Sequence, residues 1–248
     1  MASLSGIVAA ILFVAGYPVW VAVAIALMVG LLGGAFNGVL VSLIGILPFV
    51  ATLATLTIFS GAAFVASEGK TIFGRAIPAE FSGFASGGLE LGVVTIPNLT
   101  IVAAATVLVV FVLLEQTTFG RRLYAIGGNI EAAHLSGVAV RRLKLIAFSL
   151  TGFSAALAGL MYAARVASAN PTQGSGLMLN AIAAVFLGMT MSEQGEPRIL
   201  ATVIGVLILG VLDNGLTQMA VDSYVRQILV GGIIVLAVAA SSISKRRR

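Results

Sequence analysis

Long apolar runs separated by short polar segments constrain this chain more than any other feature. Val19–Ile44 and Pro48–Ala66 contain no charged residue, and Ile199–Met219 contains one. A helix needs about 20 consecutive apolar residues to cross the hydrocarbon core of a bilayer. Charged residues make up 9% of the sequence, whereas soluble proteins carry about 25%. The sequence therefore predicts an all-α polytopic integral membrane protein.

The apolar runs predict about eight transmembrane or re-entrant helices in a single transmembrane domain, residues 1–248. The first run is about twelve residues long, which is marginal for a full crossing, so it resembles the remainder of a longer helix. The sixth run is short enough to be tilted or re-entrant. In chain order the runs are Leu4–Ala15, Val19–Ile44, Pro48–Ala66, Leu99–Leu114, Leu145–Ala164, Leu177–Met191, Ile199–Met219 and Tyr224–Ser241.

The distribution of positive charge predicts the orientation of these runs. Five of the fourteen Lys and Arg residues lie between the fourth and fifth runs. Positive residues near span ends are retained in the cytoplasm, so we expect a cytoplasmic loop over about 115–144 and cytoplasmic positions for Ser192–Arg198 and Lys245–Arg248. The mixed segment 67–98 and the turn-rich Ala169–Gly176 lack a basic excess, which suits the outer face. The five cations are Arg121, Arg122, Arg141, Arg142 and Lys144.

Several classes of function are excluded or disfavoured by composition and motif. The net charge of +5 is explained by orientation, so we expect no nucleic-acid partner, and the absence of cysteine excludes disulfides and thiolate metal sites. No charged segment precedes the first apolar run, so we expect no cleaved signal peptide. Gly69-Lys70-Thr71 imitates the end of a phosphate-binding loop, but Phe64 replaces the glycine that the full motif requires.

An intramembrane protease would need a buried serine and histidine together, an H-E-x-x-H metal motif or paired acids at membrane depth. His134, the only histidine, lies in the polar segment between the fourth and fifth runs, and we interpret it as a surface residue. The acidic residues Asp213 and Asp222 are both near the end of the seventh run, but Asp222 lies outside it. We therefore expect no catalytic residues and no metal site.

Small and polar residues inside the runs predict contacts between helices. Gly30, Gly34 and Gly38 form a stripe that lets a neighbouring backbone approach closely. Asn37, on the same run, could bond to another helix or line a translocation path. Asp213, with Asn214 and Gln218, is a second path candidate, because an acidic residue at membrane depth must face a cavity, a partner or the interface. The alternative is an interfacial turn in which Asp213 meets Arg226.

A short helix with a cap at each end is predicted in the polar segment, over Asn129–Gly137. The Asn129 side chain can cap the first turn, where the helix dipole also favours the Glu131 carboxylate. Ala132 and Ala133 are small, and Gly137 can adopt the left-handed conformation that ends helices. Such a helix is either an ordinary surface helix or one that sits deeply in the groove of a partner.

Four ordered segments resemble bacterial ABC importer permeases, the ribose-type sugar permeases in particular. Glu131–Gly137 fits the E-A-A-x-x-x-G loop of these proteins within the longer stretch Arg121–Gly137, and the other matches are Ala167–Gly174, Asn180–Leu187 and Leu209–Leu216. The resemblance implies that the loop is the coupling helix seated on the ATPase subunit, a role that falls on Asn129, Glu131, Ala132, Ala133 and Gly137.

The resemblance also implies the setting in which the chain works. It implies a multi-pass protein of the bacterial inner (plasma) membrane that forms a path for a monosaccharide. The implied partners are the lipid bilayer, an ATPase subunit that binds the ATP, a periplasmic sugar-binding protein and a second permease copy, identical or a paralogue. The chain itself is expected to bind no cofactor. The alternatives are a branched-chain amino acid ABC permease and an ATP-independent facilitator or channel.

Three departures from the family pattern stand out. The chain resembles a member that lacks the first span and part of the second. Ser192–Pro197 stands where a glycine-rich turn is usual, and Asp213 stands where a neutral asparagine is common.

Overall fold

A computed structural model of the chain describes residues 1–91, 94–191, 196–222, 224–226, 228–229, 231–233 and 235. The chain forms two compact units, Met1–Gly174 (unit 1) and Ser175–Arg248 (unit 2), and each is treated by itself. The single domain over residues 1–248 stays a prediction. The tail Lys245–Arg248, Ser192 to Gly195 of the predicted inner turn and much of the predicted span Tyr224–Ser241 lie outside the described residues.

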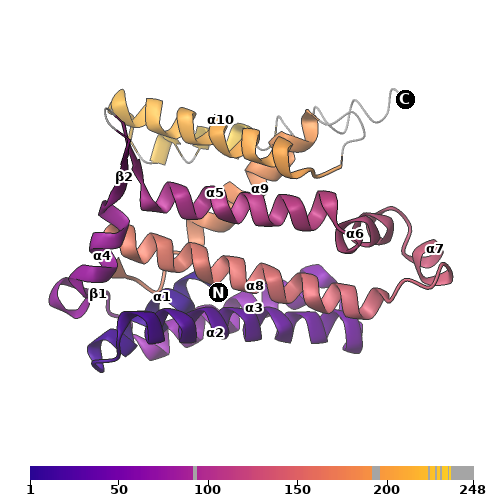
Figure 1. The fold of residues 1–248 in the computed structure, drawn as a ribbon, viewed down its shortest axis with the longest axis horizontal. Helices are drawn as coiled ribbons and strands as arrows, with labels where there is room; N and C mark the ends of the chain where they lie inside the picture. Colours follow the sequence, from indigo (N-terminus) through magenta and orange to yellow (C-terminus); the bar gives the residue numbers. More distant parts are fainter. Residues whose placement is uncertain are drawn as a thin grey trace. The chain divides into compact units, whose positions relative to one another are not determined.

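Five helices among the described residues are long and apolar enough to cross a membrane, which confirms the all-α polytopic class (Figure 1). Two of them end in a turn of π-helix, at Leu40–Ile44 and Val112–Gln116. Two shorter apolar helices, α1 (Ala2–Val14) and α9 (Ser175–Thr190), accompany them, and the number of spans stays a prediction. The five are α2 (Val19–Val39), α3 (Pro48–Ala66), α5 (Asn98–Phe111), α8 (Val140–Val166) and α10 (Ile199–Gln218).

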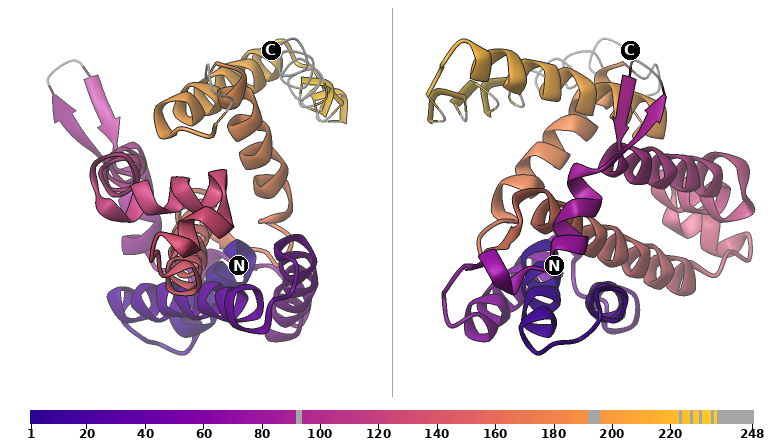
Figure 2. Two further views of the ribbon diagram at one scale, coloured as in Figure 1. Left: turned by 90° about the vertical axis from the view of Figure 1, so that its right-hand side faces the viewer. Right: turned by 60° about the vertical axis from the view of Figure 1, so that its left-hand side comes forward.

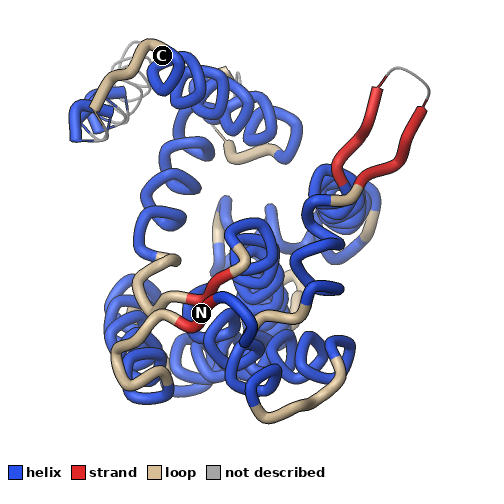
Figure 3. The backbone as a smooth tube through the Cα atoms, turned by 90° about the vertical axis from the view of Figure 1, so that its left-hand side faces the viewer, coloured by secondary structure: helices blue, strands red, loops and turns tan. Residues whose placement is uncertain are grey.

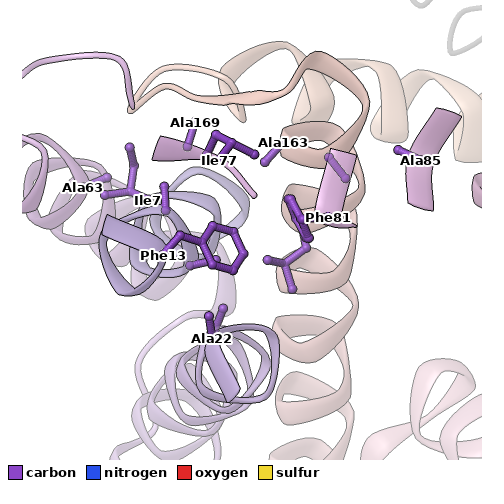
Figure 4. Close-up of a cluster of buried hydrophobic side chains, with 14 residues drawn as sticks. Ile7, Phe13, Ala22, Ala63, Ile77, Phe81, Ala85, Ala163 and Ala169 are labelled. Carbon is purple, nitrogen blue, oxygen red and sulfur yellow. The ribbon is translucent and has the colours of Figure 1, made fainter. Parts of the chain in front are cut away.

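The core of unit 1 is built mainly from small side chains around α1. Alanines of α1, α2, α3 and α8 lie in it at 4% exposure or less, so the helix backbones approach closely (Figure 4). Phe13 of α1 and Phe81 of α4 (Ala79–Ser86) are the aromatic members of this cluster, with ring centroids 5.0 Å apart. Without a hydrophobic force between helices in lipid, such close van der Waals packing holds the spans together.

The predicted glycine stripe of α2 lies against α8. A Cβ atom at Gly34 would overlap the Phe148 carbonyl oxygen and lie 2.9 Å from the Cα atom of Gly152. A Cβ atom at Gly38 would lie 3.0 Å from the Cα atom of Leu145. Gly30 meets Ala156 and Gly152 in the same way. The two backbones are therefore in direct contact, and any side chain at these positions would separate them.

The two ends of unit 1 carry different structures (Figures 1 and 3). At one end lie α4, the strand pair β1 (Ile72–Phe73) and β4 (Ser168–Ala169), and the hairpin of β2 (Gly88–Leu91) and β3 (Val94–Pro97). At the other end lie α6 (Thr118–Gly128) and α7 (Ile130–Leu135). The predicted outer and cytoplasmic loops therefore lie at opposite ends of the spans.

A turn after α8 is tied to the loop after α3. The Asn170 side chain donates a hydrogen bond to the Thr71 hydroxyl over 2.9 Å, beside the antiparallel pair of Ile72 with Ala169. The Asn170 side-chain oxygen also accepts from the backbone amide of Thr172 over 2.8 Å. The short strands were not predicted, because two-residue strands formed between distant segments leave no periodic pattern in the sequence.

Lys70, which the sequence places in an incomplete phosphate-binding motif, forms an ion pair with Glu68. Its ammonium group donates to a Glu68 carboxylate oxygen over 2.8 Å, on the exposed surface. This hydrogen bond and the positive charge lower the pKa of Glu68. The pair is a local surface contact within the loop that follows α3.

The polar segment between α5 and α8 is more helical than the sequence analysis predicts. The fifth span was expected to start at Leu145, but α8 starts at Val140. The reason is that Arg141, Arg142 and Leu143 are good helix formers, so the helix continues beyond the apolar region. In unit 2, α9 and α10 pack through small residues, because a Cβ atom at Gly205 would overlap the Ala184 carbonyl oxygen.

Candidate functional site

The short helix α7 is the first candidate site, and its local structure follows from its caps. The Asn129 side-chain oxygen accepts hydrogen bonds from the backbone amides of Glu131 and Ala132, each over 3.0 Å. Gly137 has a φ of 78°, a conformation that glycine adopts without strain. The predicted helix with its two caps is therefore present, although its role in coupling stays a prediction.

The side chains of α7 divide into one buried contact and an exposed surface. Ala133 is 5% exposed and faces its own chain, whereas Glu131 and Ala132 are exposed. Ile130 is 47% exposed and Leu135 is 85% exposed, the largest fraction of any large apolar side chain among the described residues. The exposed surface of α7 thus combines a carboxylate with two apolar side chains.

The corner between α5 and α6 fixes the position of α7. The Thr117 hydroxyl donates to the Leu113 carbonyl over 2.6 Å and accepts from the Phe119 amide over 3.2 Å, which caps α6. A Cβ atom at Gly120 would overlap the carbonyl of Leu114, so the two backbones touch. The Tyr124 hydroxyl donates to a Glu115 carboxylate oxygen over 3.3 Å. α6 is therefore held to the end of α5 at several points.

The helices α6, α7 and α8 follow one another along the chain at this end of unit 1. Figure 1 shows α6 end-on while α5 and α8 run across the page, and α7 lies beyond α6. The left view of Figure 2 shows the same end of unit 1 facing the viewer. His134, in the last turn of α7, is exposed as predicted. Along the chain, α7 is joined to α6 through Asn129 and to α8 through the four residues 136–139.

Asn37, the first path candidate, bonds to a neighbouring helix. Its side-chain oxygen accepts a hydrogen bond of 2.7 Å from the Thr55 hydroxyl of α3. Thr55 is 1% exposed, so the bond joins α2 and α3 inside unit 1. This observation supports the helix-contact interpretation of Asn37 over the path interpretation.

The other path candidates lie in unit 2, near the end of α10. Asp213, Asn214 and Gln218 are exposed. The Arg226 guanidinium donates to an Asp213 carboxylate oxygen over 3.3 Å and to the Thr217 hydroxyl over 2.6 Å. The Arg226 side chain is 24% exposed. This ion pair is the one expected if Asp213 lies in an interfacial turn and meets Arg226. The other path candidate, Asn37, lies in unit 1.

Reversing the charge of Asp213 should destabilise unit 2, because Arg226 is the less exposed partner. Asp213→Lys places two cations together, whereas Asp213→Asn keeps an oxygen that accepts from Arg226. We expect a loss of about 1–2 kcal/mol for the lysine variant and less than about 1 kcal/mol for the asparagine variant. Thermal unfolding in detergent measures both. Arg226→Glu should restore stability in the Asp213→Lys background, and the absence of any rescue would contradict the pairing.

Two features of the site were not found from the sequence. Leu135 and Ile130 were not singled out, although an apolar residue on a helix outside the spans is a usable signal for a contact surface. Thr117 and Gly120 were also missed, because their partners, Leu113 and Leu114, were assigned to a uniform apolar run. Periodicity alone does not show where such a run bends into the next helix.

Comparison with known proteins places the chain in a family. The sequence profile of the family described as "Branched-chain amino acid transport system / permease component" matches residues 1–238. The Ribose import permease protein RbsC of Bacillus subtilis (strain 168) is 45% identical over 202 residues, which are 82% of this chain and 62% of that protein. RbsC of Escherichia coli (strain K12) is 40% identical, over 95% of this chain and 73% of that protein.

A third relative is the D-allose transport system permease protein AlsC of Escherichia coli (strain K12), at 37% identity over 96% of this chain and 71% of that protein. The chain thus spans 62% to 73% of the length of these relatives. No solved structure matches the chain significantly. The match over residues 1–238 shows that the chain belongs to the branched-chain amino acid transport system permease family, whose members are multi-pass inner-membrane transport components rather than enzymes.

Proposed function

We propose that this chain is the transmembrane permease subunit of an ABC importer for a monosaccharide. The observation that carries the proposal is the 40% identity, over 95% of the chain, to the Ribose import permease protein of Escherichia coli. Two permease copies, identical or paralogous, form the path across the bilayer. A separate ATPase binds the ATP, so the chain needs no cofactor of its own, and a periplasmic sugar-binding protein delivers the substrate.

In this proposal α7 is the coupling helix. The ATPase contacts the exposed Glu131, Ala132 and Leu135, while Asn129 and Gly137 fix the two ends of the helix. When ATP binding closes the ATPase pair, α7 moves with it. The caps of α6 and the contact of Gly120 with Leu114 support a rigid connection to α5. The continuous helix α8 carries the motion along its length to the opposite end of unit 1.

A branched-chain amino acid is the second candidate substrate, and the description of the matching family favours it. Uptake into proteoliposomes that contain the permease, its ATPase and the binding protein separates the two. We expect uptake of labelled ribose or a related sugar that requires internal ATP. ATP-dependent uptake of leucine without uptake of sugar would show that the substrate is an amino acid rather than a sugar. Transport by the permease alone, without an ATPase, would favour a facilitator or channel.

Glu131→Lys should reduce stimulation of the ATPase by the permease about tenfold, because it reverses an exposed charge at the proposed contact. ATP hydrolysis by the co-purified complex measures this effect. Glu90→Lys is the matched control, since it makes the same charge change at the opposite end of unit 1 and should leave the stimulation unchanged. Glu131→Gln keeps the size of the side chain and should have an intermediate effect. Equal stimulation by Glu131→Lys and the parent would contradict the role of α7.

A further inference from the structure

α6 has the amphipathic character of a helix that lies in a membrane surface. Phe119, Leu123 and Ile126 recur along one face and are half-buried, whereas Arg121 and Arg122 are exposed. The helix lies across the ends of the spans rather than parallel to them (Figures 1 and 2). Interfacial helices combine an apolar face near the acyl chains with basic residues directed towards the headgroups. α6 meets this description by its sequence, its exposure and its orientation.

The start of α8 adds two exposed cations at headgroup depth. The apolar part of α8 begins at Leu145, and Arg142 and Arg141 precede it by three and four residues. At 1.5 Å per residue their Cα atoms lie about 4.5 and 6 Å outside the hydrocarbon. The headgroup region of a bilayer is about 5–7 Å thick on each side. Arg141 and Arg142 therefore reach the level of the lipid phosphates.

The four arginines Arg121, Arg122, Arg141 and Arg142 lie in a segment with an excess of positive charge. The segment 115–144 holds five cations against two carboxylates, Glu115 and Glu131. Glu115 accepts a hydrogen bond from Tyr124, and neither of the ion pairs described above, Lys70 with Glu68 and Arg226 with Asp213, involves one of the four arginines. The guanidinium groups of Arg121, Arg122, Arg141 and Arg142 are thus exposed and available to an anionic ligand.

We infer that Arg121, Arg122, Arg141 and Arg142 bind the headgroups of anionic phospholipids in the adjacent leaflet. The placement of α6 favours lipid over the ATPase as the occupant. α6 lies across the span ends, at the level of the membrane surface, whereas α7 lies further out along the direction of the spans. The guanidinium group also matches the bidentate geometry of phosphate oxygens. The inference does not depend on the proposed transport function.

The test measures lipid binding by the purified full-length chain with native mass spectrometry in detergent. Dioleoylphosphatidylglycerol should bind more tightly than dioleoylphosphatidylcholine. Each cation near an anionic surface contributes about a fivefold gain in binding, so the double variants R121Q/R122Q and R141Q/R142Q should each weaken phosphatidylglycerol binding about 25-fold. The matched control is R75Q/R165Q, which removes two exposed cations from the opposite end of unit 1 and should leave the binding unchanged.

Further arms of the experiment separate the lipid from other ligands. An excess of inorganic phosphate should not displace phosphatidylglycerol, and displacement would assign the cations to free phosphate. Equal binding of the two lipids, or an unchanged affinity in both glutamine pairs, would overturn the inference. The inference would also be overturned if the double glutamine variants lost binding of the ATPase but retained binding of phosphatidylglycerol. R121K/R122K keeps the charges and should retain most of the binding, so loss of binding in this variant, with thermal unfolding unchanged, would overturn the charge-based assignment.

Discussion

Leu135→Ala should weaken the binding of the partner ATPase about 30-fold and leave the fold of this chain unchanged. The Leu135 side chain is 85% exposed on a helix that lies outside the spans, so contact with acyl chains does not explain its exposure. Truncating a buried leucine side chain to alanine loses about 2 kcal/mol of burial energy, which corresponds to about a 30-fold change in the dissociation constant. Alanine is the better helix former, so α7 itself should persist.

The measurement is the dissociation constant of the ATPase subunit from the permease in nanodiscs, with thermal unfolding of the free permease as the check on folding. Leu89→Ala is the matched control, since Leu89 is 54% exposed in β2 at the opposite end of unit 1. That variant should bind the ATPase like the parent. An unchanged dissociation constant for Leu135→Ala would show that α7 does not present this side chain to the ATPase.

Gly34→Ala should destabilise unit 1 by about 1–3 kcal/mol, the range for overfilling a packed interface. The added methyl group would overlap the Phe148 carbonyl oxygen, and backbone atoms cannot rotate away as side-chain atoms can. α2 and α8 would have to separate along the stripe of Gly30, Gly34 and Gly38. Leucine at the same position should abolish the folded state, because no gap of that size exists between the two helices.

Gly61→Ala is the matched control for this substitution. Gly61 lies inside α3, and nothing lies within 4 Å of a Cβ atom built there. Because alanine is the better helix former, this variant should be stabilised by up to about 1 kcal/mol in the same thermal unfolding assay. The two glycine-to-alanine substitutions should therefore have opposite signs. A Gly34→Ala variant as stable as the parent would show that α2 and α8 are not in backbone contact.

The sequence by itself determined the membrane class, the approximate limits of the spans and the capped helix over Asn129–Gly137. These properties depend on local physics: runs of apolar side chains match the thickness of the bilayer, and the caps act on backbone groups within a few residues. Val19–Ile44 and Pro48–Ala66 agree with the structure to the residue for this reason. The four family-like segments could likewise be found without coordinates, because they are contiguous in sequence.

Only the tertiary structure decided which helix each polar or small residue meets. The sequence left two interpretations of Asn37 open, and the hydrogen bond of 2.7 Å from the Thr55 hydroxyl of α3 to its side-chain oxygen favours the contact between helices. The exposure of Leu135 depends on α7 lying beyond α6, and the need for glycine at position 34 depends on α8. Such contacts join residues far apart in the chain, and the apolar runs are too uniform to specify their partners. Hydrophobicity determines that a helix enters the membrane, whereas side-chain shape and hydrogen bonding determine its neighbours.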